Sequence, residues 1–155
     1  MTGIPERPVK LCISSSPTLL PVVRAAVEKM CQLLGLEDEA TGGVVLSVDE
    51  ALANVIRHAY GDDHDQPIDV DLIPIAGDNG RCLKICLADR GPHVDPAQIK
   101  SRNLSEVRPG GLGVHIIQEH MDEVEFRARE GGGTRLVMIK RVGVSDSQDQ
   151  KEVSS

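Results

Sequence analysis

The stretch LSVDEALANVIRHAY, residues 46–60, has the pattern of a helix packed against a core. Its polar side has Glu50 and Asn54 one turn apart, with Arg57 and His58 one turn further. Apolar side chains recur at the i, i+3, i+4, i+7 spacing of a single helix face. These side chains belong to Val45, Val48, Leu52, Val55, Ile56 and Ala59. The pattern predicts a helix with one buried face.

Two interpretations of the polar face remain open from this segment alone. Glu50, Asn54, Arg57 and His58 are ordinary residues for the solvated side of an amphipathic helix. They are also suited to form part of a site, because residues four apart on a helix are neighbours. The rest of the sequence has to decide between the two.

Composition limits the partners of the chain. Its 155 residues fit a single domain. Aromatic residues make up only 1%, which means that aliphatic side chains must fill the core and disfavours nucleic-acid binding by base stacking. The net charge of −7 disfavours nucleic acid and anionic membranes by repulsion. We therefore expect a protein or small-molecule partner.

The sequence also predicts a soluble, cytoplasmic protein. The four cysteines have no CxxC spacing and are expected to be free thiols in a reducing compartment. The first ten residues lack the apolar region of a signal peptide, and no segment approaches the roughly 20 apolar residues of a membrane span.

The element order is predicted to be β α α β β loop α β β. Residues 36–43, with two glycines, are interpreted as the connection between the first two helices. The predicted strands are 9–14, 68–72, 81–89, 122–129 and 134–141, and the predicted helices are 16–36, 44–60 and 111–121.

These elements predict an α/β (α+β) two-layer sandwich. Each helix has one apolar stripe and the late strands pair as hairpins, so we expect a mixed, mainly antiparallel sheet with helices packed on one face. Residues 143–155 are polar and lack apolar anchors, which predicts a disordered tail after a domain spanning 1–142.

Strand 81–89 ends in a carboxylate on its core side. Asp89 has the same parity as Leu83, Ile85 and Leu87, and a carboxylate there is costly unless donors reach it. One interpretation is that Asp89 accepts a hydrogen bond from a ligand amine, with Gly91 letting the ligand approach. The other is that the strand frays and Asp89 caps the turn.

Glycines begin the last predicted helix. Gly110, Gly111 and Gly113 would expose backbone N–H groups at its positive end, which suits phosphate oxygens, although glycines before helices are common. The segment 90–110 before it is about 20 residues without periodicity, a length typical of a functional loop. Arg102 and Arg108 are its candidate phosphate contacts, or else simply solvated.

The remaining patterns are weaker. In GGGTRL, Thr134 has the parity of Leu136 and Met138, so its hydroxyl would face the core side, although three glycines also suit a plain hairpin turn. The histidines do not suggest a metal site, and no hydrolase motif is present in the sequence.

Taken in chain order, four segments resemble the nucleotide-site boxes of the Bergerat-fold (GHKL) ATPases shared by gyrase and histidine kinases. The segments are DEALANVIRHAY, LADRGP, RPGGLGVHIIQEHMDEVEF and GGGTRL. The resemblance is closer to bacterial anti-sigma-factor serine/threonine kinases and covers residues 9–141. One departure is His93, where the wider superfamily has a second glycine, but DRGPHVDP is similar to the anti-sigma branch.

The resemblance implies a role for each polar position. Glu50 would be the general base, and Asn54 would hold Mg²⁺ that bridges the phosphates. Asp89 would accept from the adenine amino group, Gly91 would give the ring room, and Thr134 would support Asp89 through water. The other implied nucleotide contacts are Arg57, Arg108, Gly110, Gly111, Leu112 and Gly113.

The same resemblance implies ATP and Mg²⁺ as cofactors and an enzyme that phosphorylates a protein. It would be a serine/threonine kinase acting on an anti-sigma antagonist protein and binding a sigma factor, and the family suggests a homodimer. Two alternatives stay open: an ATP-sensing protein-binding module without phosphoryl transfer, and a structural domain without nucleotide.

Overall fold

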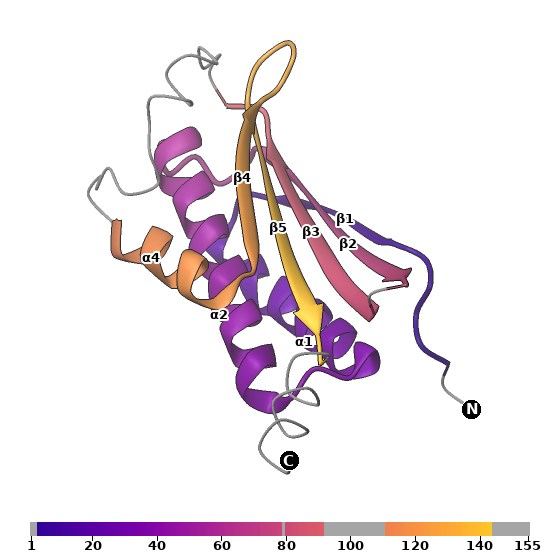
Figure 1. The fold of residues 1–155 in the computed structure, drawn as a ribbon. Helices are drawn as coiled ribbons and strands as arrows, with labels where there is room; N and C mark the ends of the chain where they lie inside the picture. The colour runs from indigo at the N-terminus through magenta and orange to yellow at the C-terminus, as the bar shows by residue number, and fades with distance from the viewer. Residues whose placement is uncertain (1–2, 79, 92–110, 144–155) are drawn as a thin grey trace, which may run out of the picture.

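The computed structural model describes residues 3–78, 80–91 and 111–143. They form an α+β sandwich of two layers, in which helices cover one face of a five-stranded sheet (Figure 1). The predicted architecture is confirmed, and every strand pairing in this part of the chain is antiparallel. The predicted tail after residue 143 and most of the predicted loop 90–110 lie outside the described residues.

The sheet has the strand order β1-β2-β3-β5-β4. Consecutive strands β2 and β3 pair along their length, as do β4 and β5, so both predicted hairpins form. The register of β2 and β3 begins with Ile68 opposite Asp89, and Ile68 is fully buried. The strands are β1 (Val9–Ser14), β2 (Pro67–Gly77), β3 (Gly80–Asp89), β4 (Glu123–Ala128) and β5 (Thr134–Val142).

The first helix begins as the sequence predicted, with one addition. Ser16 caps a short 3-10 turn, η1 (Pro17–Leu19), by accepting a hydrogen bond from the N–H of Thr18 at 3.4 Å. The α-helix α1 (Leu20–Leu34) follows and ends at Gly35 in the left-handed region. Its apolar stripe is buried against the sheet, with Val23, Val27, Met30 and Leu34 all in the core.

The second helix, α2 (Asp38–Asn54), begins earlier than predicted, so the interpretation of residues 36–43 as a connection is wrong for residues 38–43. Its first turn carries Asp38 and Glu39, which interact favourably with the positive helix end. Gly43 is buried against helix α4 (Gly111–His120), where an added Cβ would lie 2.6 Å from Nδ1 of His120. This glycine allows close packing of α2 and α4, which lie side by side in Figure 1.

After Asn54 the helix widens into one π-helical turn, η2 (Val55–Ala59). The turn closes where the N–H of Tyr60 donates to the oxygen of Val55 at 3.1 Å. Such widened turns occur often at functional sites because they redirect the side chains of a helix. Here the widening comes directly after two of the predicted site residues.

The core between the layers is aliphatic, as the composition predicted. Its largest fully buried side chains are leucines, isoleucines and valines from both layers, together with Met138. Within the described ranges, no helix is long and apolar enough to cross a membrane.

Candidate functional site

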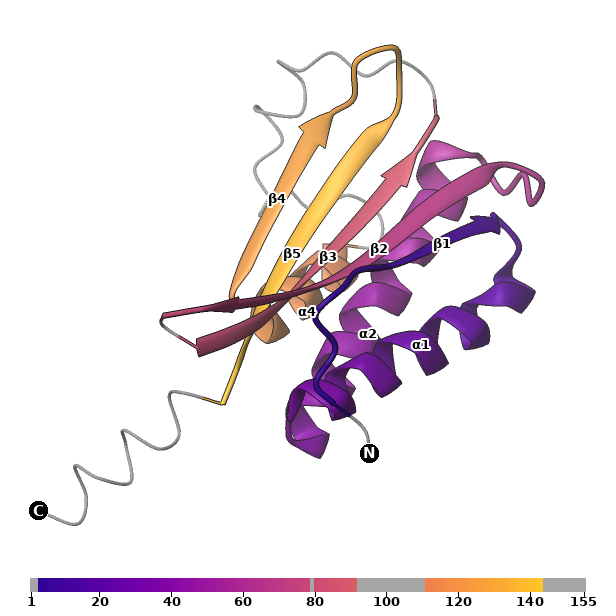
Figure 2. The same ribbon diagram turned by 90° about the vertical axis from the view of Figure 1, so that its right-hand side faces the viewer.

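Segments that the sequence marked separately meet at one end of the sandwich. The carboxyl end of α2 with η2, the end of β3 and the β4–β5 turn lie together at the top of Figure 1, and the turned view in Figure 2 agrees. Hydrogen bonds join them: Tyr60 contacts Arg90, and Thr134 contacts Asp89. The fold therefore brings three of the four predicted boxes to one place.

Asp89 is the buried carboxylate of this site, with 4% of its surface exposed. Its Oδ1 accepts from the N–H of Gly91 at 2.9 Å and from the N–H of Thr134 at 3.3 Å. Burial raises the pKa of Asp89, while these two N–H groups and the charge of Arg129 act to lower it. The strand continues through Asp89, so the fraying interpretation is wrong, although the residue does accept a turn hydrogen bond from Gly91.

Thr134 contacts Asp89 through its backbone N–H, whereas the sequence pointed to its hydroxyl. The preceding Gly133 has φ +91°, and a Cβ at this position would lie 2.1 Å from the backbone oxygen of Asp89. A glycine is needed here because any side chain would collide with the end of β3. The triple glycine is thus both a hairpin turn and a contact with the site.

Arg129 and Tyr60 also hold this strand end, and sequence reasoning missed both. Nη1 of Arg129 donates to the backbone oxygen of Asp89 at 2.8 Å. The Tyr60 hydroxyl accepts from the N–H of Arg90 at 2.6 Å and donates to the oxygen of Pro67 at 2.6 Å. Burial raises the pKa of this hydroxyl. The one available signal was that Tyr60 is the only tyrosine of the chain.

Gly91 lies where the sequence placed it, next to the carboxylate. A Cβ on Gly91 would lie 2.9 Å from the backbone oxygen of Ala59 and 3.2 Å from Oδ1 of Asp89. The space between η2 and the carboxylate therefore accepts only glycine without rearrangement. This close packing against Ala59 accounts for the glycine by itself, and the expected role of Gly91 in giving a ligand ring room stays a prediction.

The polar face of α2 divides into two parts. Arg57 and His58 are exposed, as solvated residues would be, whereas Glu50 and Asn54 are half-buried. Asn54 is the last residue of α2, directly before η2. Glu50 is one turn earlier on the same side, because residues four apart lie above one another on a helix. The interpretation of a simple solvated face therefore suits Arg57 and His58 better than Glu50 and Asn54.

The predicted phosphate-binding glycines can be placed only in part. Helix α4 begins at Gly111, as the sequence predicted. Leu112 and Gly113 belong to its first turn, where N–H groups have no partner within the helix. Arg102, Arg108 and Gly110 lie outside the described residues.

No cluster of three or more His, Cys, Asp or Glu side chains that could hold a metal ion is present among the residues that can be described. Mg²⁺, however, commonly keeps several waters and binds through one or two protein groups together with substrate phosphates. A single amide ligand such as Asn54 fits that mode.

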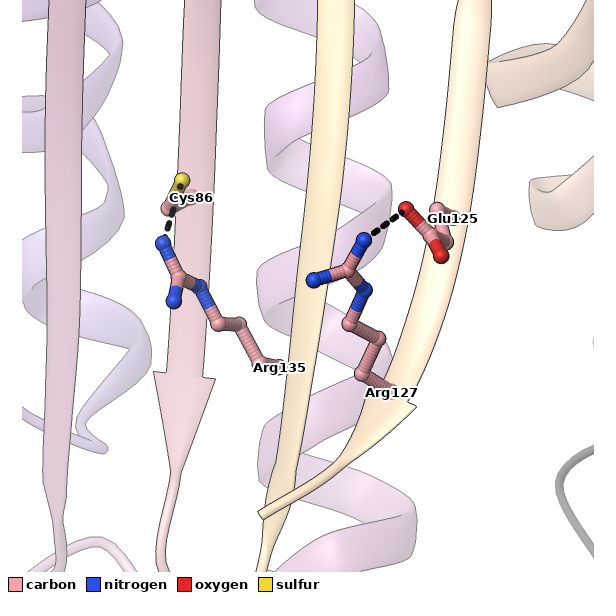
Figure 3. Close-up of polar contacts among 4 residues, drawn as sticks. All are labelled: Cys86, Glu125, Arg127 and Arg135. Atoms are coloured by element: carbon pink, nitrogen blue, oxygen red, sulfur yellow. Dashed lines mark hydrogen bonds and ion pairs between the residues drawn. The ribbon is translucent and has the colours of Figure 1, made fainter. Parts of the chain in front are cut away.

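A hollow of about 400 Å³ on the other face of the sheet contains none of the predicted site residues. Acidic Asp69 and Asp71 and basic Arg135 line it, so its charge is mixed. Figure 3 shows this open face, where Arg135 donates to Sγ of Cys86 at 3.4 Å and Arg127 pairs with Glu125. The candidate site is therefore the Asp89 end of the molecule and not this hollow.

The chain is similar to serine-protein kinases of known sequence. The chain is 24% identical to the serine-protein kinase RsbW of Oceanobacillus iheyensis, over 95% of both chains. It is also 24% identical to the RsbW of Staphylococcus aureus, over 94% of this chain and 96% of that protein.

Solved structures share the fold at lower identity. The SiaB–SiaC complex of Pseudomonas aeruginosa contains a chain with a TM-score of 0.63 and 13% identity, over 86% of this chain and 90% of that one. The RsbU and RsbW domains of a Mycobacterium tuberculosis protein match with a TM-score of 0.62 and 17% identity, over 89% of this chain and 33% of that one.

The family comparison covers the fold and the site together. The model of the histidine kinase-like ATPase domain matches residues 13–140. This range begins near the end of β1, ends within β5 and includes all four predicted boxes. The chain therefore belongs to the histidine kinase-like ATPase domain family.

Proposed function

We propose that this chain binds ATP with Mg²⁺ and transfers the γ-phosphoryl group to a serine or threonine of an antagonist protein in an anti-sigma system. The observation that carries the proposal is the Asp89 carboxylate, buried at the end of β3 and fixed by the N–H groups of Gly91 and Thr134. The family, and relatives that are serine-protein kinases, support it.

Asp89 would recognise the adenine base. In the described part of the chain its hydrogen bonds end on Oδ1, which leaves Oδ2 for the adenine amino group. Gly91 would give the ring room, because a larger residue, with its Cβ 2.9 Å from the backbone oxygen of Ala59, would displace the strand end that holds the carboxylate. Burying a charged carboxylate costs free energy, and a hydrogen bond from the adenine amino group would offset part of that cost.

The phosphates would extend toward α2 and the start of α4. Backbone N–H groups of the first turn of α4, from Gly111 onward, suit phosphate oxygens at a positive helix end. Asn54 would be the protein ligand of Mg²⁺, which when bound neutralises phosphate charge. Arg57 and Arg108 would be further phosphate contacts.

Glu50 would serve as the general base for transfer. It accepts the proton of the acceptor hydroxyl as that oxygen forms a bond to the γ-phosphorus, and the bond from phosphorus to the β,γ-bridging oxygen breaks to release ADP. Because Glu50 is one turn before Asn54, proton acceptance and metal binding would lie on the same side of α2, which supports this role.

The remaining parts of the proposal rest on the sequence and on its resemblance to the anti-sigma-factor kinases. A kinase of this kind would act in the cytoplasm through its domain 1–142, would bind both the antagonist protein and a sigma factor, and would form a homodimer. The alternative, an ATP-sensing binding module, differs from it at one residue, because a module without transfer does not need Glu50 as a base.

Two substitutions separate these roles. Glu50→Gln should preserve Mg-ATP affinity and lower transfer by about 10²- to 10⁴-fold, as expected for loss of a general base. Asn54→Ala should weaken Mg-ATP binding. The measurements are calorimetric ATP affinity and single-turnover transfer of labelled phosphate from ATP to a candidate antagonist protein.

The matched control is Glu28→Gln, the same change at an exposed position of α1, which should alter neither quantity. A Glu50→Gln variant that transfers at the wild-type rate would favour the sensing module. Unaltered Mg-ATP affinity in Asn54→Ala would mean that Asn54 does not hold the metal.

A further inference from the structure

We propose that Tyr60 is a positioning residue for base recognition: its hydroxyl holds the segment Asp89–Gly91 so that the Asp89 carboxylate meets the adenine amino group. This inference rests on the proposed ATP site. It assigns a role to a residue that belongs neither to the phosphate end nor to the base contacts themselves.

The Tyr60 hydroxyl continues the sheet where its hydrogen-bond ladder stops. The last residue pair of β2 and β3 is Ile68 with Asp89, so the N–H of Arg90 lies beyond the ladder. Tyr60 accepts from that N–H at 2.6 Å and donates to the oxygen of Pro67, the first residue of β2, at 2.6 Å. One hydroxyl therefore joins the two strand ends beyond their final pair.

The opposite side of the strand end is held separately. Arg129 donates to the backbone oxygen of Asp89 at 2.8 Å, and Gly133 packs against the same oxygen. These contacts fix the carbonyl group of Asp89, and Gly133 also lies against the Cα of Arg90, but neither Arg129 nor Gly133 bonds the N–H of Arg90. In the described part of the chain, Tyr60 is the side chain that holds the N–H of Arg90.

The hydrogen bond between Tyr60 and Arg90 affects the Asp89 carboxylate through Gly91, the next residue in the chain. The N–H of Gly91 donates to Oδ1 of Asp89, so the direction of the carboxyl group depends on where Gly91 lies. Gly91 in turn lies against Ala59, the residue before Tyr60. A shift of Arg90 away from Tyr60 would move Gly91 and turn the carboxyl group that adenine must meet.

Loss of the Tyr60 hydroxyl should change the position of the end of β3 more than it changes the folding stability of the protein. The Tyr60 ring packs against the core, and phenylalanine would keep that packing. Arg90 and Pro67 are exposed, so water can replace the hydroxyl at both backbone groups. Tyr60→Phe is therefore expected to fold normally while the end of β3 becomes less fixed.

The experiment compares two nucleotides that differ only in the group that Asp89 would bind. ATP carries the 6-amino group, and purine riboside triphosphate lacks it. The ratio of their Kd values, analogue over ATP, measures recognition of the amino group. We expect Tyr60→Phe to lower this ratio by about 2- to 10-fold, the range of one ordinary hydrogen bond, while the Kd of the analogue stays unchanged.

Two further variants make the result specific. Ser14 lies opposite Pro67 in the sheet, and Ser14→Ala removes the hydrogen bond of its hydroxyl to the oxygen of His64. Because Tyr60 keeps its own hydroxyl in this variant, the ratio should stay unchanged. In an Asp89→Asn background, Tyr60→Phe should have no further effect on the ratio, because both changes remove the same contact.

Equal weakening of both nucleotides, or an unchanged ratio in Tyr60→Phe, would overturn the positioning role while leaving ATP binding intact. A wild-type protein that binds neither nucleotide would refute the proposed function itself, and the inference with it. Thermal unfolding of Tyr60→Phe close to that of the wild type shows that any fall in the ratio does not come from misfolding.

Discussion

Replacing Asp89 by asparagine should separate function from stability. Asparagine has the same shape, and its carbonyl oxygen can still accept from the N–H groups of Gly91 and Thr134. Its amide nitrogen, however, donates where the adenine amino group also donates. One hydrogen bond is lost and a donor stays unpaired. Together these should cost about 1 to 3 kcal/mol of binding free energy, which corresponds to about a 5- to 150-fold weaker ATP affinity.

Asp89→Asn should not lower folding stability, in contrast to its effect on ATP affinity. Burial raises the pKa of Asp89, so this group contributes stability that is fully present below the pKa of the unfolded chain and is lost as pH rises through the folded pKa. Above that range the buried charge disfavours the folded state. Asp89→Asn removes the charge and should be at least as stable as the wild type at neutral pH.

The assay combines urea unfolding at neutral and acidic pH with calorimetric titration of ATP. Asp71→Asn, at a half-exposed position of β2 on the open face, is the matched control and should change neither quantity strongly. An Asp89→Asn protein that binds ATP as tightly as the wild type would refute the adenine role. A variant that loses binding and stability together would show that Asp89 is mainly structural.

Other substitutions and titrations test the packing around the site. Gly133→Ala should destabilise the fold by about 2 to 5 kcal/mol in urea unfolding, from its positive φ and its collision with the end of β3, and a near-neutral effect would contradict that contact. Gly43→Ala should destabilise by crowding α4, whereas Gly42→Ala, with open space around it, should stabilise by up to about 1 kcal/mol; equal effects would contradict the close helix approach. Tyr60 is the only tyrosine, so its titration can be followed by ultraviolet absorbance, and its pKa should lie above the ordinary tyrosine value of about 10 because of burial. Its contribution to stability is then fully present below the pKa of the unfolded chain and is lost as pH rises through the pKa of the folded protein. A midpoint at or below the ordinary value would contradict its burial.

Much of the fold followed from periodicity. Alternation in 81–89 predicted both the strand and the burial of Asp89, because parity in a strand fixes which face each side chain takes. The apolar stripes of the helices predicted the face that meets the sheet. These patterns worked because each depends only on residues close together in the chain.

What the sequence did not reveal depends on contacts between distant segments. Gly42 and Gly43 suggested a connection because glycine is a poor helix former, but packing against α4 outweighs that preference. The clamp of Tyr60 and Arg129 on the end of β3 joins residues 30 and 40 positions apart, and no local pattern marks it. The π-helical turn η2 is likewise only one turn long, which is too short for a repeat of apolar residues to reveal it in the sequence.

The most direct test of ATP binding at Asp89 is the free energy of unfolding of the wild type and of Asp89→Asn, each with and without Mg-ATP. At a concentration 100 times the wild-type Kd, a ligand that binds only the folded state adds about 2.7 kcal/mol. We expect that increase in the wild type and a clearly smaller one in Asp89→Asn at the same concentration. No increase in the wild type at millimolar Mg-ATP, or an equal increase in both proteins, would contradict an ATP site built on Asp89.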